Sequence, residues 1–138
     1  MTTFQTELQI QTTGQGLVKV TSLVEDALKD APSGAGLLHI FIQHTSASLL
    51  IQENADPTAR QDLEEFIQRL VPENQSWHRH LDEGPDDTVS HMKAAVLPQA
   101  LTVPVRDGRL LLGTWQGLYV WEHRRAPHVR KLVLTLLL

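Results

Sequence analysis

The last third of the chain, LTVPVRDGRLLLGTWQGLYVWEHRRAPHVRKLVLTLLL from Leu101 to Leu138, decides the fold class. Its apolar residues alternate with polar ones or run together over segments of strand length, and Asp107-Gly108 is typical of a tight hairpin turn. We expect a hairpin over 101–112, a strand over 115–122, and a final strand over 129–138 after the turn at Ala126-Pro127. This part of the molecule is therefore predicted to be β-structure.

The first part of the chain holds three more segments of strand character. From Met1 to Gln11, apolar residues alternate with glutamine and glutamate, which predicts a strand with one exposed face. Residues 37–43 are apolar on both faces, as in a central strand, and the run Leu49–Ile51 predicts a shorter one. Strand segments therefore stand at both ends of the chain.

Helical periodicity appears between these strand segments. One helix is predicted to begin near Ser22, where Ser22 and Glu25 suit a capping box, and to end before Pro32. A second is predicted from Asp56 to Leu70, because Asp56 suits the N-cap and Pro57 the first helical position. Its buried stripe is expected to consist of Leu63, Phe66, Ile67 and Leu70.

Strands at both ends of the chain, with helices between them, predict the fold class. We expect an α+β domain with a mainly antiparallel sheet and two or three helices, and not a βαβ nucleotide-binding fold. A polar loop is expected over Glu73–Asp87, followed by a short helix that carries His91. A loop of this length in a compact domain is often functional.

Length and composition narrow the class of protein. The chain has 138 residues, of which 41% are hydrophobic and 20% charged, which suits one domain over residues 1–138. The net charge of −4, without a massed basic block, argues against nucleic-acid binding. No apolar run approaches the roughly 20 residues of a membrane helix, and no signal-peptide pattern is present. We therefore expect a cytoplasmic protein that binds neither nucleic acid nor membranes.

A first polar cluster follows the central strand, at His44-Thr45-Ser46-Ala47-Ser48. It places one imidazole beside three hydroxyls and several backbone amides, which are groups that can hold an anion. Thr45, Ser46 and Ser48 are the candidate phosphate-binding residues, and His44 is a candidate catalytic residue. The alternative is a turn at the end of a strand, whose hydroxyls satisfy their own backbone.

A second polar cluster lies in the long loop and the helix after it. Its members are His78, His80, Glu83, Asp86, Asp87 and His91. The chain has no cysteine, so any metal must be bound by histidine or carboxylate. Three histidines would hold Zn²⁺ and leave a position open for water, whereas carboxylates alone would favour Mg²⁺ with a phosphorylated ligand. Glu83 and Asp87 are candidate catalytic bases, and His78 is expected to take no part in the site. The alternative is a solvated polar loop.

Two further segments have both a functional and a structural interpretation. Gly113 and Gly117 flank Trp115 and Gln116, which could form the wall of a ligand site or, alternatively, a core or subunit contact. The basic run near the last turn could bind phosphate, although such a run is more often a solvated face. Its members are Arg124, Arg125, His128, Arg130 and Lys131.

Separated motifs along the whole chain resemble the YjbQ family. They are His44–Ser48, Glu53–Pro57, His80 with Glu83-Gly84, Asp86-Asp87 with His91, and Leu112–Gly117. The resemblance implies a sandwich or half-barrel of strands in a bacterial, cytosolic homotrimer. It also implies that His44, His80 and His91 meet around one divalent metal, Zn²⁺ or Mg²⁺, or around an anion. The turn over His123–Pro127 departs from the family pattern, so no ligand role is carried over to it.

Three functions remain open at this point. The resemblance implies a transferase, the family's secondary thiamine-phosphate synthase, which joins an aminopyrimidine methyl diphosphate to a thiazole phosphate with release of pyrophosphate. The residues also suit a metal-dependent hydrolase or lyase on a small phosphorylated metabolite, with Glu83 or Asp87 as base. The third is a non-catalytic module whose bound ion or anion stabilises the oligomer.

Overall fold

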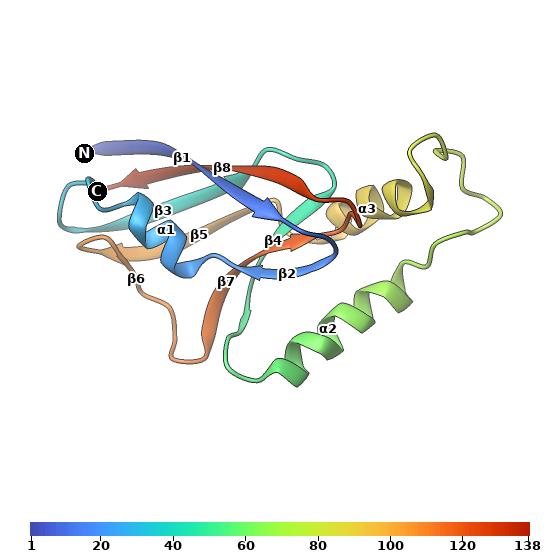
Figure 1. The fold of residues 1–138 in the computed structure, drawn as a ribbon. Helices are drawn as coiled ribbons and strands as arrows, with labels where there is room; N and C mark the ends of the chain where they lie inside the picture. The colour runs from blue at the N-terminus through green and yellow to red at the C-terminus, as the bar shows by residue number, and fades with distance from the viewer.

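The computed structural model describes every residue from 1 to 138. In chain order the elements are β1 (Thr3–Thr12), β2 (Gly16–Lys19), α1 (Thr21–Ala27), β3 (Ala35–Ile42), β4 (Ala47–Glu53), α2 (Pro57–Leu70), α3 (Pro85–Val96), β5 (Ala100–Arg106), β6 (Arg109–Leu110), β7 (Gln116–Glu122) and β8 (His128–Leu137). Figure 1 shows the strands gathered in one body, with α2 and α3 extending from one end of it. Strands and helices are thus combined as an α+β fold.

The strands form two antiparallel sheets that curve around one core as a half-barrel. The larger sheet has the order β1-β8-β3-β5-β6, and the smaller one has the order β2-β7-β4. Seventeen buried apolar residues, contributed by both sheets and by α1, form the main core cluster. The predicted α+β class, with antiparallel sheets and three helices, is confirmed.

β8 shows how the sequence pattern produces this core. Leu132, Leu134 and Leu136 alternate along the strand and are fully buried, because successive side chains of a strand point to opposite faces. β8 also pairs with β1 on one side and β3 on the other, so both of its edges are covered. The apolar C-terminal run is thus a central strand. None of the helices has the length and apolar character needed to span a membrane.

The N-terminal helix differs from its prediction. A short strand, β2, precedes α1, and the residue at the N-cap of α1 is Val20, which makes no side-chain cap. The predicted capping box of Ser22 and Glu25 is therefore wrong. The Glu25 carboxylate instead accepts a hydrogen bond from the backbone N–H of Leu110 at 3.1 Å, so tertiary pairing has replaced the local cap.

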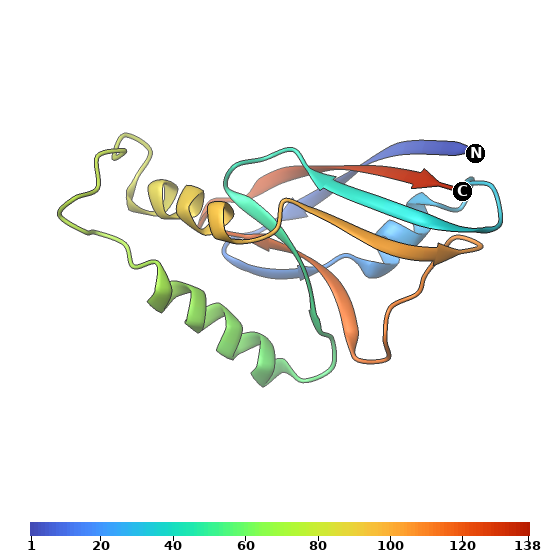
Figure 2. The ribbon, with the colours of Figure 1, turned by 180° about the vertical axis from the view of Figure 1, so that it is seen from behind.

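Helix α2 has the predicted bounds but a different buried face. Asp56 is its N-cap, and its Oδ1 accepts a hydrogen bond from Thr58 N–H at 2.9 Å. Of the predicted stripe, only Ile67 is buried, while Phe66 and Leu70 are more than half exposed. The prediction that the whole stripe is buried is therefore wrong, because α2 extends away from the sheets instead of lying flat on them (Figures 1 and 2).

Helix α3 is longer than predicted and begins earlier. It starts at Pro85, so Asp86 and Asp87 lie in its first turn and not in the preceding loop. Figure 2 shows α3 and the loop that joins it to α2 at one end of the molecule, while both chain termini lie at the other end. The polar residues singled out in the sequence are therefore concentrated at the end away from the termini.

Candidate functional site

Three side chains from the loop and α3 meet at one point. His80 Nε2 lies 2.7 Å from Asp87 Oδ2, and His91 Nε2 lies 3.1 Å from the same oxygen. The ligand atoms of all three residues lie within 4.8 Å of one another. Asp87 is only 2% exposed, whereas the side chains of His80 and His91 are 53% and 40% exposed. The carboxylate thus forms the floor of the cluster, and the two imidazoles form its solvent-facing rim.

The helix and a neighbouring strand end determine this geometry. Asp87 and His91 are four residues apart in α3, so they lie one above the other on the same helix face. On its other side, His91 donates from Nδ1 to the backbone carbonyl of Thr45 at 2.9 Å. Thr45 stands in the turn before β4, so the cluster ties α3 to the smaller sheet.

The Thr45 contact determines where His91 carries its proton. A carbonyl oxygen can only accept, so Nδ1 must be the protonated nitrogen. In a neutral imidazole, Nε2 then has a lone pair that points at the Asp87 carboxylate. Only a second proton on the ring, or a cation between the nitrogen and the oxygen, makes this contact favourable. The donor set of two imidazoles and one carboxylate fits a divalent transition metal such as Zn²⁺.

Arg124 anchors the carboxylates of α3 from behind. Its Nη1 donates to Asp87 Oδ1 at 2.8 Å, its Nε donates to Asp86 Oδ2 at 3.0 Å, and its Nη2 donates to the Glu83 carbonyl at 3.2 Å. Asp87 therefore gives one oxygen to Arg124 and the other to the two histidines. Asp86 also accepts from the backbone N–H of Arg125 at 3.0 Å, which fixes the turn after β7 against α3.

These contacts determine the charge of Asp87. Burial alone would raise the pKa of this carboxyl, but hydrogen bonds to His80 and Glu83, the charge that His91 carries when its ring is doubly protonated, and the charge of Arg124 outweigh burial and lower it. Asp87 is therefore ionised at neutral pH. An ionised, buried and oriented carboxylate is a suitable metal ligand.

His44 does not join this cluster within the chain. Its Nε2 accepts from the backbone N–H of Lys131 at 2.8 Å, and its Nδ1 lies 3.3 Å from Arg130 Nη1. Burial, followed by the charge of Arg130, lowers the pKa of His44. With both ring nitrogens engaged, it is not placed as a metal ligand. Within one chain the predicted convergence of three histidines is therefore corrected to two histidines and Asp87.

Comparison with known proteins agrees with the motifs and with this fold. Residues 6–138 match the family described as UPF0047 protein YjbQ-like. This chain belongs to the YjbQ-like family. It is 42% identical to the YjbQ protein of Escherichia coli O157:H7 over 96% of each chain, and 43% identical to a UPF0047 protein of Synechocystis over 91% of this chain and 86% of that one. A conserved hypothetical protein from Thermus thermophilus superposes with a TM-score of 0.85 at 36% identity, over 96% of this chain and 99% of the other.

The predicted phosphate-binding hydroxyls of this YjbQ-like chain are largely engaged by the protein. Ser48 is fully buried, and its Oγ lies 2.9 Å from Nε2 of the buried His123. Ser46 Oγ accepts from Arg130 Nη2 at 2.9 Å. Thr45 is exposed, and its hydroxyl is the one of the three that makes no hydrogen bond within the chain. Of the three predicted hydroxyls, only that of Ser48 is thus removed from solvent, while Thr45 and Ser46 each keep a hydroxyl donor.

Two adjoining hollows connect the histidine cluster with His44. One, of about 590 Å³, is lined by His91 and Thr45, and the other, of about 500 Å³, by His44 and Thr45. Gln99 lines both, so the two hollows share a wall. A small molecule lying beside His91 would therefore also be near His44, which places this residue at the edge of the candidate site.

The predicted wall of Trp115 and Gln116 lies elsewhere in the YjbQ-like fold. Gln116 begins β7 and pairs with Glu53, whereas the His123–Arg124 turn that meets α3 follows the other end of that strand. Seven strand residues span about 20 Å. Within one chain the wall prediction is therefore wrong, because the two residues lie at the far end of β7.

Sequence reasoning missed the structural role of Arg124, and for Glu83 it considered only the carboxylate. Arg124 was taken as part of a solvated basic face, yet its side chain is 17% exposed and holds two buried carboxylates. Its position directly after an apolar strand was the available signal, because a cation at the end of a buried strand needs counter-charges. Glu83 itself is exposed, and its backbone carbonyl helps to hold Arg124.

Proposed function

We propose that this YjbQ-like chain is a metal-dependent hydrolase or lyase that acts on a small phosphorylated metabolite. The ion is held by His80, Asp87 and His91. The observation that carries the proposal is the orientation of His91, whose Nδ1–H is used by the Thr45 carbonyl and whose Nε2 lone pair faces the buried Asp87 carboxylate. A cation satisfies both atoms at once. Two imidazoles in the ligand set favour Zn²⁺ over Mg²⁺.

The residues of the chain have separate roles in this proposal. Thr45 fixes the proton on His91, and Arg124 orients Asp87 from the opposite side. A bound divalent ion would polarise a phosphoryl or carbonyl oxygen and lower the pKa of water. Glu83, exposed beside the cluster, is the candidate base, and the hollow lined by Thr45 and Gln99 would receive the substrate.

Thiamine-phosphate synthase activity is the second candidate, with weaker support. It requires donors for a departing diphosphate and for a second phosphate. Ser48 is fully buried against His123 and does not supply such a donor, while Ser46 already accepts from Arg130 and offers only its own hydroxyl proton. Formation of thiamine phosphate is therefore measured in parallel, with the same protein.

The proposal is tested by titrating the metal-stripped chain with Zn²⁺ in a calorimeter. We expect one ion per chain and a loss of affinity of at least about a hundredfold for Asp87→Asn and His91→Ala. His44→Ala is the matched control and should bind normally. Phosphate release from a set of phosphorylated metabolites, and formation of thiamine phosphate, are then measured with and without Zn²⁺. Equal Zn²⁺ affinity in all four proteins would overturn the proposed site, and binding without turnover would leave a non-catalytic module.

We also propose that the chain is cytoplasmic and assembles as a homotrimer. Exposed apolar side chains on α2, the following loop and α3 support a subunit contact. Leu70, Trp77 and Val96 are 55%, 63% and 66% exposed, and with their neighbours they line a hollow of about 320 Å³. Such an apolar surface at one end of a small domain is typical of an interface.

A further inference from the structure

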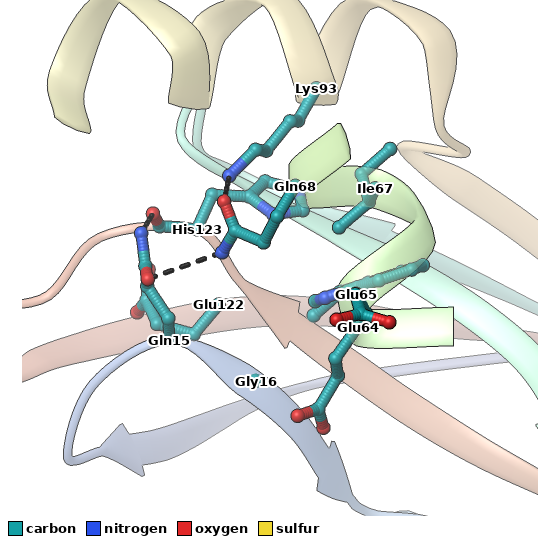
Figure 3. A pocket seen from close by; sticks show the side chains of 10 residues that line it. Gln15, Gly16, Glu64, Glu65, Ile67, Gln68, Lys93, Glu122 and His123 are labelled. Carbon is teal, nitrogen blue, oxygen red and sulfur yellow. Dashed lines mark hydrogen bonds between the residues drawn. The ribbon is translucent and has the colours of Figure 1, made fainter. Parts of the chain in front are cut away.

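A second cavity lies on the other side of α3 from the histidine cluster. It has a volume of about 420 Å³ and is enclosed by α2, α3, β2 and the end of β7. Figure 3 shows the side chains that line it, with Lys93 on one side and Glu64 on the other. None of His80, Asp87 and His91 lines this cavity, so its chemistry is separate from that of the proposed ion.

Lys93 is the unusual residue of this cavity. It is 1% exposed, and its Nζ makes one hydrogen bond, to Gln68 Oε1 at 2.9 Å. No carboxylate lies within ion-pairing distance of the ammonium. An ammonium has three donors, and buried charges in proteins are normally paired. Lys93 therefore keeps two donors without a partner in the protein, and the carboxylates of Glu73 and Asp86 act on its charge only from beyond ion-pairing distance.

A chain of amides holds Gln68 in the orientation that Lys93 requires. Gln68 Nε2 donates to Gln15 Oε1 at 3.2 Å, and Gln15 Nε2 donates to the His123 carbonyl at 3.0 Å (Figure 3). Because each amide nitrogen is engaged, the Gln68 oxygen must face the lysine. The cationic end of the cavity is thus held in position in the absence of a ligand.

The opposite end of the cavity offers a carboxylate. Glu64 Oε1 accepts from the backbone N–H of Leu17 at 3.2 Å, which anchors the side chain beside Gly16, while its other oxygen makes no hydrogen bond within the chain. Ile67 and Trp121 supply an apolar wall. Glu122 also lines the cavity, but its charge is matched by Arg130, whose Nε donates to Glu122 Oε1 at 2.7 Å.

We propose that this cavity is a second ligand site, which takes a small zwitterion with an acid group at Lys93 and an amine at Glu64. The charge arrangement carries the assignment, since a plain anion would leave Glu64 unpaired and a plain amine would leave Lys93 unpaired. The apolar wall between them suits the methylene groups of an ω-amino acid. The site does not depend on the ion bound by His80, Asp87 and His91.

The test is a calorimetric titration of the full chain with ω-amino acids from glycine to 6-aminohexanoate. Acetate, butanoate and butylamine are the singly charged comparisons. We expect one member of the series to bind at least about tenfold more tightly than the simple acid or amine, because both charges are paired. The chain length of the best ligand then measures the separation of Lys93 and Glu64.

Two variants and two controls complete the design. Lys93→Met should abolish binding, and Glu64→Gln should reduce the affinity for the best amino acid to that for the simple acid. Lys29→Met, which removes an exposed lysine, and His91→Ala should bind normally. Glu64 is partly exposed, so its variant remains informative if Lys93→Met does not fold. A series that shows no preference over the simple acids, or unchanged binding by Lys93→Met, would leave Lys93 only as a link between α3 and α2.

Discussion

At the scale of single residues, neighbours in the sequence have separate environments. Thr45 serves the histidine cluster through its backbone carbonyl, whereas Ser46 and Ser48 bond to Arg130 and His123. His78 and His80 differ in the same way. His78 is 8% exposed and its Nε2 is buried without a hydrogen-bond partner, while His80 contacts Asp87. Residue type alone does not distinguish these pairs.

His78 and His80 are therefore predicted to respond differently to alanine substitution. His80→Ala should lower Zn²⁺ affinity by at least about tenfold, because it removes one of the three proposed ligands. His78→Ala should leave Zn²⁺ affinity unchanged, since its ring packs edge-on against Trp77 with centroids 4.5 Å apart and does not face the cluster. Calorimetric titration of both variants decides the matter, and equal losses would contradict the assignment.

His123 is predicted to make stability depend on pH. Burial, followed by the charge of Lys93, lowers its pKa from 6.5 to about 3. Between pH 6.5 and about pH 3 the unfolded chain therefore binds a proton at this residue that the folded chain does not. The contribution of neutral His123 to the free energy of unfolding is thus present above pH 6.5 and is lost as the pH decreases. The loss from this residue at pH 5 is about 2 kcal/mol.

Urea unfolding at pH 7.5 and pH 5 measures this contribution. His123→Asn should be less sensitive to pH than the natural chain by about 2 kcal/mol, because asparagine does not titrate in this range. His39→Asn, at an exposed histidine, is the matched control and should keep the natural pH dependence. An unchanged pH dependence in His123→Asn would show that this imidazole is not the responsible group.

At the scale of elements, α3 separates two kinds of chemistry. Asp87 and His91 lie on one face with His80, while Lys93, two residues later, lies on another face with Gln68. Two residues of a helix differ by about 200° around its axis, so these faces are nearly opposite. The helix is joined to the smaller sheet through Thr45 and to the turn after β7 through Arg124.

The pairing of β3 with β8 depends on a glycine. A Cβ at Gly36 would lie 2.1 Å from the carbonyl oxygen of Leu137, which belongs to the backbone of the neighbouring strand. Gly36→Ala is therefore predicted to destabilise the protein by about 2–3 kcal/mol, because the strands must move apart. Gly113→Ala is the control, since its Cβ would meet only the flexible side chain of Gln116.

Urea unfolding at pH 7.5 compares the two glycine variants. A lower midpoint with an unchanged slope for Gly36→Ala, and a change below about 1 kcal/mol for Gly113→Ala, are the expected results. Equal effects of the two substitutions would mean that the approach of β3 to β8 is looser than the structure indicates.

At the scale of the whole molecule, polar chemistry and exposed apolar surface lie at the same end. The two sheets and α1 bury the core, while α2, α3 and the loop between them extend beyond it (Figures 1 and 2). Phe66 and Leu70 are exposed there, although their spacing in α2 is that of a buried stripe. A second copy of the chain would complete the burial of this helix.

Light scattering tests the proposed assembly. We expect a mass of three times the chain mass of 15.5 kDa, and a shift towards monomer for the double variant Leu70→Ser, Trp77→Ser. Leu23→Ser, at an exposed apolar residue of α1, is the control and should remain trimeric. A monomer at micromolar concentration in the unmodified chain would rule out the assembly.

The sequence by itself determined the local structure and the kinds of chemistry available. Strand alternation, the Asp107-Gly108 turn and the Asp56 cap each depend on residues close together in the chain, and each was recovered. The absence of cysteine and the grouping of His80, Asp87 and His91 within twelve residues also indicated that any metal would be bound by histidine and carboxylate.

Only the tertiary structure decided how these groups are paired. The Thr45 carbonyl contacts His91, 46 residues away in the sequence, and Arg124 contacts Asp87, 37 residues away. His44 instead bonds to the backbone N–H of Lys131 and is not part of the cluster. Such contacts depend on how α3 packs against the strand ends and not on local propensity. For the same reason only the tertiary structure shows that Lys93 is buried beside Gln68 of α2 without a directly paired carboxylate.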